Sequence, residues 1–135
     1  MDARFLLDTN ICIYIRRQQP PAVLARFEQL KHGEAVLSVI TYGELVYGAE
    51  KSQSREQASR LLAELAALLP VMELPSRAGQ CYGAIRAALE AKGEMIGNND
   101  LWIAAHARAA GLMLVTNNER EFRRIQGLEI QNWAD

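Results

Sequence analysis

The 135-residue chain falls in the usual size range of one domain, and we expect a single domain over residues 1–135. Half of the residues are hydrophobic and 23% are charged, which is typical of a globular protein. The apolar runs are far shorter than the ~20 residues needed to cross a bilayer, so we expect no membrane segment. A net charge of −1 does not indicate a strongly basic nucleic-acid-binding domain, although a local basic rim could serve an enzyme.

The start of the chain and its cysteines predict a cytoplasmic location. Asp2 is acidic and no small-residue cleavage site follows it, so we expect no signal peptide. Cys12 and Cys81 form no CxxC motif, and two lone thiols are typical of a reducing compartment.

The first third of the chain alternates between apolar strand-like runs and helical patterns. The predicted strand Phe5–Leu7 precedes a short helix over Thr9–Arg17, and the prolines at 20 and 21 interrupt it. A second strand at 35–40 is apolar along most of its length, which favours burial on both faces, as in a parallel sheet. We expect the neighbouring helices at 22–30 and 41–50.

The rest of the chain continues this alternation. Ser54 and Gln57 have the spacing of a capping box, and leucines at helical intervals predict a helix that Pro70 ends. The remaining predicted elements are a strand at 71–74, helices at 76–91 and 100–110, a strand at 112–115, a short helix near 119–125 and an edge strand near 128–130. This order predicts an α/β fold whose parallel sheet is covered by helices on both faces.

Three acidic residues share one local context. Asp8 directly follows the first strand, Glu44 lies in the first turn of the helix after the second strand, and Asp100 opens the helix after a glycine-containing loop. A polar cluster at 116–121 follows the strand at 112–115. Because ligands bind beyond the carboxyl ends of parallel strands, we expect these side chains to meet at that edge of the sheet.

Carboxylates that meet repel one another unless some stay protonated or a cation neutralises them. Oxygen ligands alone favour Mg²⁺ or Mn²⁺ over zinc, and such ions can activate a water and stabilise charge on a phosphate. This chemistry suggests phosphodiester hydrolysis. A structural role stays open for each acid: Asp8 as an N-cap, Glu44 in a capping box with Thr41, and Asp100 as a charge favoured at a helix N-terminus.

Four ordered sequence blocks carry a family resemblance. The chain resembles the PIN-domain nucleases, and within them the VapC-type toxins of bacterial toxin–antitoxin pairs, over about residues 5–133. The segment FLLDTNICIYI at 5–15 is similar to the first block, and SVITYGELVYGAEKSQ at 38–53 is similar to the second. The segment IGNNDLWIAAHARAAGLMLVTNNEREF at 96–122 is similar to the third and fourth.

The resemblance implies a three-layer α/β/α sandwich with a mostly parallel sheet of four or five strands. It also implies a Mg²⁺- or Mn²⁺-dependent endoribonuclease that arrests translation. A small antitoxin partner and a toxin homodimer are expected with it. Members similar in these blocks cut initiator tRNA in its anticodon stem-loop, so the resemblance implies an RNA substrate of this kind.

The resemblance also assigns roles to individual residues. It implies that Asp8, Glu44 and Asp100 are catalytic and hold the metal, and that Glu121 is a fourth catalytic candidate. The residues expected to assist them are Thr9, Asn10, Thr116 and Asn118.

One position departs from the family pattern. Many PIN domains carry an aspartate where this chain has Asn118, although related toxins also have asparagine there. The fourth carboxylate could therefore come from Glu121, from Glu119 or from neither. We expect activity to survive this departure.

Two other functions are compatible with acids at a sheet edge. A phosphoacceptor signalling domain also places acids and Mg²⁺ there, but it needs a lysine after the last strand, and we find none well placed. A catalytically silent PIN module acting only through its partner is the other alternative, and the intact trio of acids argues against it.

Some remaining polar and aromatic residues have a structural interpretation that is simpler than a functional one. His106 lies in an alanine-rich helix, where a buried role is favoured over metal ligation, and Trp102 is expected to pack at an end of the core rather than stack on a base. Solvated helix faces explain most of the cations that could contact an RNA backbone, which are Arg16, Arg17, Lys51, Arg86, Lys92, Arg120, Arg123 and Arg124.

Overall fold

The computed structural model describes residues 2–134, so the two end residues of the predicted domain lie outside it. The strands are β1 (Phe5–Leu7), β2 (Ala35–Ser38), β3 (Val71–Met72), β4 (Met113–Val115) and β5 (Ile130–Gln131). The helices are α1 (Thr9–Arg17), α2 (Pro21–Glu28), α3 (Val39–Glu50), α4 (Arg55–Leu68), α5 (Arg77–Lys92), α6 (Asn98–Ala110) and α7 (Glu119–Phe122). The alternation follows the prediction, and most bounds differ from it by one to three residues.

Within residues 2–134, the strands form a parallel sheet in the order β3-β2-β1-β4-β5. The central strand is β1, whose Leu6 is in register with Val36 on β2 and with Leu114 on β4. All three side chains are buried, as expected for strands that helices cover on both faces. The predicted α/β class and parallel sheet are confirmed.

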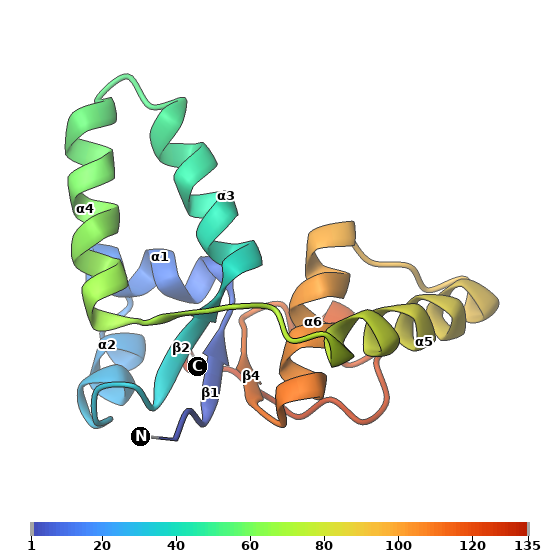
Figure 1. The fold of residues 1–135 in the computed structure, drawn as a ribbon. Helices are drawn as coiled ribbons and strands as arrows, with labels where there is room; N and C mark the ends of the chain where they lie inside the picture. Colours follow the sequence, from blue (N-terminus) through green and yellow to red (C-terminus); the bar gives the residue numbers. More distant parts are fainter. Residues whose placement is uncertain (1, 135) are drawn as a thin grey trace.

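Successive side chains of β1 point to opposite faces of the sheet and enter two separate cores. Leu6 packs with residues of α5 and α6, whereas Phe5 and Leu7 pack with residues of α1, α2 and α4. Figure 1 shows α5 and α6 on one side of the strands and α1 to α4 on the other. The architecture is therefore the expected three-layer α/β/α sandwich.

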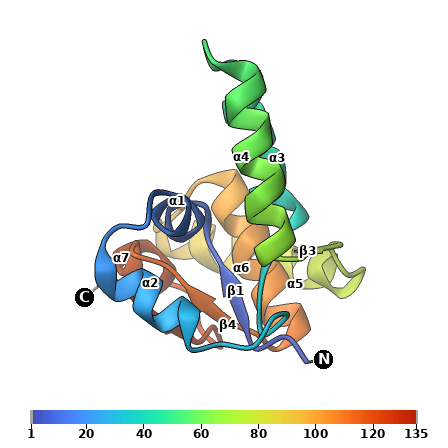
Figure 2. The same cartoon turned by 90° about the vertical axis from the view of Figure 1, so that its left-hand side faces the viewer.

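Helices α3 and α4 form a pair that extends well beyond the body of the molecule (Figures 1 and 2). Ser54 is the N-cap of α4, but its hydroxyl makes no capping hydrogen bond, so the predicted capping box with Gln57 is wrong. The Ser54 backbone (φ −112°, ψ 58°) lies outside the extended region that an N-cap serine usually occupies. Burial of Leu62 and Leu65 stabilises α4 instead.

Among residues 2–134, every helix is too short or too polar to span a bilayer.

Candidate active site

Asp8 lies directly after β1 and is only 6% exposed. Its Oδ1 accepts a hydrogen bond from the Ile11 N–H at 3.0 Å, so Asp8 is the N-cap of α1. Its Oδ2 accepts a hydrogen bond from the Thr116 hydroxyl at 2.5 Å. Burial raises the pKa of Asp8, the two hydrogen bonds oppose this rise, and the nearby Glu44 adds to it. The structural role of Asp8 is therefore confirmed, while its second oxygen faces the residues that follow β4.

Glu44 projects from α3 toward α1 and α6. The prediction that Glu44 lies in the first turn and completes a capping box with Thr41 is wrong, because α3 begins at Val39 and Ser38 is its N-cap. The Oε1 atom of Glu44 accepts from the Thr9 hydroxyl at 2.6 Å, and Oε2 accepts from the Asn99 side-chain amide at 3.4 Å. Side chains of two other helices, rather than its own backbone, orient this carboxylate.

Asp100 lies in the first turn of α6, which begins at Asn98 rather than at Asp100 as predicted. Its side chain is half-buried. Burial raises the pKa of Asp100 to about 6, and the charges of Glu121, Glu44 and Asp8 contribute to this rise, in that order. Three other carboxylates from different parts of the chain therefore act on Asp100 at this edge of the sheet.

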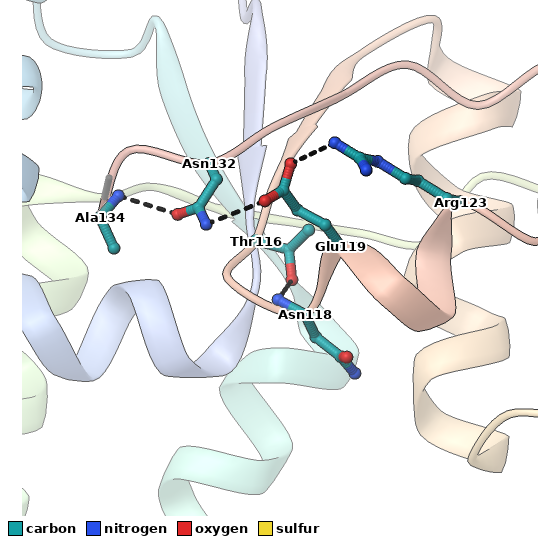
Figure 3. Close-up of polar contacts among 6 residues, drawn as sticks. All are labelled: Thr116, Asn118, Glu119, Arg123, Asn132 and Ala134. Carbon is teal, nitrogen blue, oxygen red and sulfur yellow. Dashed lines mark hydrogen bonds and ion pairs between the residues drawn. The ribbon is translucent and has the colours of Figure 1, made fainter.

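The segment after β4 distinguishes the two candidates for a fourth carboxylate. Glu119 accepts hydrogen bonds from Arg123 at 2.9 Å and from Asn132 at 3.2 Å, and Figure 3 shows it lying between these two residues. Glu121, in contrast, lies near enough to Asp100 to raise its pKa. The electrostatics therefore favour Glu121 over Glu119.

Thr116 and Asn118 contribute in different ways. Thr116 is fully buried, and its hydroxyl oxygen accepts from the Asn118 N–H at 2.9 Å while the hydroxyl donates to Asp8. The Asn118 side chain points away from Thr116 and Glu119 (Figure 3). Thr116 thus connects the end of β4 to Asp8, and Asn118 supplies a backbone N–H.

The Asn10 side chain binds Asn117 rather than one of the acids. It donates to the Asn117 side-chain oxygen at 3.3 Å, and the Asn117 amide donates to the Tyr14 hydroxyl at 2.7 Å. Only the Asn10 backbone acts on Asp8, where its hydrogen bond lowers the pKa of the carboxyl. Thr9 therefore binds the Glu44 carboxylate, whereas the Asn10 side chain binds Asn117.

The charges at this site have no basic counterpart among the described residues. Within residues 2–134, no lysine, arginine or histidine forms an ion pair with any of the four carboxylates of Asp8, Glu44, Asp100 and Glu121. Their spacing also forms no ready-made cage, because no three acidic, histidine or cysteine side chains in this range converge closely enough to hold an ion. The donor set is oxygen alone, which suits a hard cation such as Mg²⁺.

A groove of about 460 Å³ runs beside this site. Thr9 and Glu44 line one part of it, and Arg16 and Arg17 of α1 line another. Arg16 and Arg17 are two of the cations that could contact an RNA backbone, and they line the same groove as Glu44.

Sequence reasoning missed two polar residues, of which Asn99 binds an acid of the site and Ser38 caps the helix that carries one. Asn99 binds Glu44, and its position next to Asp100 was the only available signal. Ser38 caps α3 by accepting from the Ile40 N–H at 3.2 Å. Because Ser38 is followed by the β-branched residues Val39 and Ile40, the strand was predicted to continue through it.

The PIN domain family model matches residues 5–128, and the chain belongs to the PIN domain family. The chain is 42% identical over 131 residues to ribonuclease VapC2 of Haemophilus influenzae, which covers 97% of this chain and 98% of the relative. It is 41% identical over 131 residues to the tRNA(fMet)-specific endonuclease VapC of Shigella flexneri, with the same coverage. The crystal structure of DNA-bound VapBC from Salmonella typhimurium matches with a TM-score of 0.91 at 39% identity, covering 98% of this chain and 99% of that one. Membership of this family sets aside the phosphoacceptor hypothesis.

Proposed function

We propose that this protein is a divalent-metal-dependent endoribonuclease, the toxin of a toxin–antitoxin pair, folded as a single PIN domain. The observation that carries the proposal is that the charges of Glu121, Glu44 and Asp8 all act on Asp100, while no cation among residues 2–134 forms an ion pair with any of these four carboxylates. Relatives about 40% identical over nearly the whole chain are named as ribonucleases, which supports the same activity.

Asp8, Glu44 and Asp100 would hold Mg²⁺ or Mn²⁺, with Glu121 as the fourth acid. A bound ion of this kind activates a water and stabilises charge on the phosphate under attack. Burial, together with the charges of Glu121, Glu44 and Asp8, raises the pKa of Asp100, and a bound cation would relieve this cost of ionisation, so the residues fit the ion. Among residues 2–134 these acids form no ready-made cage, so the fit rests on their oxygen donors and their negative charge.

The surrounding residues orient these acids before any ion binds. The Ile11 N–H and the Thr116 hydroxyl each occupy one oxygen of Asp8, which fixes the plane of the carboxylate. Thr9 and Asn99 do the same for Glu44. Orientation of the ligands by such partners is what sustains metal affinity in other metal sites.

RNA cleavage by the purified protein tests this proposal. We expect Asp8→Asn, Glu44→Gln and Asp100→Asn each to lower the cleavage rate roughly 100-fold or more while the fold stays intact. The matched control is Glu119→Gln, which removes a nearby carboxylate that Arg123 and Asn132 engage, and which should keep its activity. Chelation with EDTA should stop cleavage and Mg²⁺ should restore it. Full activity in two of the three site variants would refute the proposal.

We further propose that the substrate is a tRNA, with the anticodon stem-loop of initiator tRNA as the first candidate, and that cleavage inhibits translation in the cytoplasm. The name of the Shigella flexneri relative supports a tRNA substrate. Sequencing RNA ends after brief expression of the wild type and of Asp8→Asn identifies the target. Ends that appear equally with both proteins would contradict the tRNA proposal.

A small antitoxin is the proposed partner, and a homodimer is the proposed oligomer. The VapBC structures that match this chain support an antitoxin. Expression of the toxin alone should arrest bacterial growth, and co-expression of an antitoxin encoded beside it should abolish that arrest. Light scattering of the purified toxin measures its oligomeric state, and a monomer at micromolar concentration would contradict the homodimer.

A further inference from the structure

A buried hydrogen bond joins α6 to the start of α3, two helices that carry acids of the site. The His106 Nδ1 atom lies 2.8 Å from the Ser38 hydroxyl oxygen, across 68 positions of sequence. Both side chains are completely buried. Among residues 2–134, neither side chain forms a hydrogen bond with a carboxylate of the site, so any action on the site is through the helices.

The two partners lie on the helices that carry two of the acids. His106 follows Asp100 by six residues on α6, and Ser38 precedes Glu44 by six residues as the N-cap of α3. Six residues span roughly 9 Å along a helix axis. Helices α3 and α6 are also in direct contact. The hydrogen bond therefore joins the two helices about equally far from Glu44 and from Asp100.

A histidine at this place is unfavourable for stability alone. Within residues 2–134, the His106 Nε2 atom is buried without a hydrogen-bond partner. An unpaired buried polar atom costs free energy that an apolar side chain of similar size would not incur. Burial also lowers the pKa of His106, so the imidazole is neutral near pH 7. Its neighbours along α6, Ala105 and Ala107, are buried and apolar, so packing alone does not explain the imidazole.

We propose that His106 is a positioning residue that holds α6 against the start of α3 and so sets the separation of Asp100 from Glu44 for the metal. The proposal rests on the proposed metal-dependent function. It assigns to the Ser38–His106 hydrogen bond a geometric role, because a shift of one helix along the other would move one acid relative to its partner.

The geometry of the bond indicates which substitution should restore it. The Ser38 hydroxyl accepts from the Ile40 N–H and can either donate to His106 Nδ1 or accept from it, according to the imidazole tautomer. Asparagine places a side-chain amide close to the position of Nδ1, and its oxygen or its N–H can pair with the same hydroxyl, so His106→Asn can keep the bond.

Calorimetric titration of Mn²⁺ into the metal-free protein tests the proposal without relying on activity. We expect His106→Leu and Ser38→Ala each to weaken Mn²⁺ binding roughly tenfold, the lower end of the effect of partners that orient metal ligands. The double variant should be no weaker than Ser38→Ala, because Ser38→Ala already removes the hydrogen bond that His106→Leu removes. His106→Asn should bind within about threefold of the wild type. In RNA cleavage at saturating metal, kcat should fall while KM stays unchanged.

Ile103→Val is the control for general loosening of α6, since Ile103 is buried on the same helix and makes no polar bond. It should keep wild-type Mn²⁺ affinity while losing some stability in urea. If His106→Leu does not fold, Ser38→Ala and His106→Asn carry the comparison.

Wild-type Mn²⁺ affinity and kcat in Ser38→Ala or His106→Leu would overturn the proposal, as would an equal loss in Ile103→Val. A wild-type protein that binds Mn²⁺ but cuts no RNA would refute the proposed function and leave the Mn²⁺ comparison to decide on His106. A wild type that binds no Mn²⁺ would refute both.

Discussion

The ionised Asp100 carboxylate destabilises the metal-free protein, so we expect Asp100→Asn to make it more stable while removing activity. The pKa of Asp100 is raised from 3.8 to about 6, a rise of about two pH units. Each pH unit corresponds to about 1.4 kcal/mol, which would give roughly 3 kcal/mol for a fully enclosed group. Because the side chain is only half-buried and solvent screens its charge, we expect about 1 kcal/mol.

The sign of the pH dependence follows from the raised pKa. Below pH 3.8 the carboxyl is protonated in the folded and the unfolded protein, so its ionisation makes no difference to stability. As the pH rises from about 4 to 6, the unfolded protein releases this proton first and the folded protein becomes relatively less stable. The extra stability of Asp100→Asn over the wild type should therefore grow between pH 4 and 6 and stay constant above pH 6.

Urea unfolding in EDTA at pH 4, 5, 6 and 7.5 measures this difference. In thermal unfolding at pH 7.5, the melting temperature of the variant should be roughly 3 °C or more above that of the wild type. Saturating Mg²⁺ should stabilise the wild type, which binds the ion, and not the variant. Equal stability of the two proteins at pH 7.5 without metal, or a gap that is the same at pH 4 and 7.5, would refute the electrostatic reasoning.

Three further outcomes test other parts of the structure. Thr116→Val removes the donor to Asp8 and should lower stability by about 1–3 kcal/mol and RNA cleavage with it, whereas Thr116→Ser should keep both, as urea unfolding and a cleavage assay would show. Leu6→Ala, at the centre of the sheet, should cost about 2–5 kcal/mol in urea unfolding, and a loss below 1 kcal/mol would contradict the two-core packing. Cys12 is buried, which raises the pKa of its thiol, so Ellman's reagent should modify Cys81 in the native protein and Cys12 only after unfolding.

Short-range pattern predicted most of the elements because each pattern acts within a few residues. The bounds Phe5–Leu7 and Thr9–Arg17 are as predicted, since Asp8 separates an apolar run from a helical one. The predicted start of α3 was two residues too late, because the prediction relied on the same short-range pattern. Val39 and Ile40 read as strand, and only the capping bond of the Ser38 hydroxyl shows that the helix has begun.

The candidate site was predictable in part. The positions of Asp8, Glu44 and Asp100 after strands and at the starts of helices indicated that they could meet, and the raised pKa of Asp100 reports that their charges interact. Local pattern did not identify the partners that orient them. Thr116 lies 108 residues from Asp8, and Asn99 lies 55 residues from Glu44. The family resemblance named Thr116 among the assisting residues, but it did not name Asn99.

The amino-acid sequence by itself determined the alternation of strands and helices, the burial of the strands on both faces and the types of acid available. These properties depend on periodicity and on hydrogen bonds between near neighbours. Only the tertiary structure decided which carboxylates act on Asp100, that Arg123 binds Glu119 while the charge of Glu121 acts on Asp100, and that His106 reaches Ser38. The physical reason is that the crossovers of a parallel sheet bring the ends of distant strands to one edge, where charge and hydrogen bonding act through space.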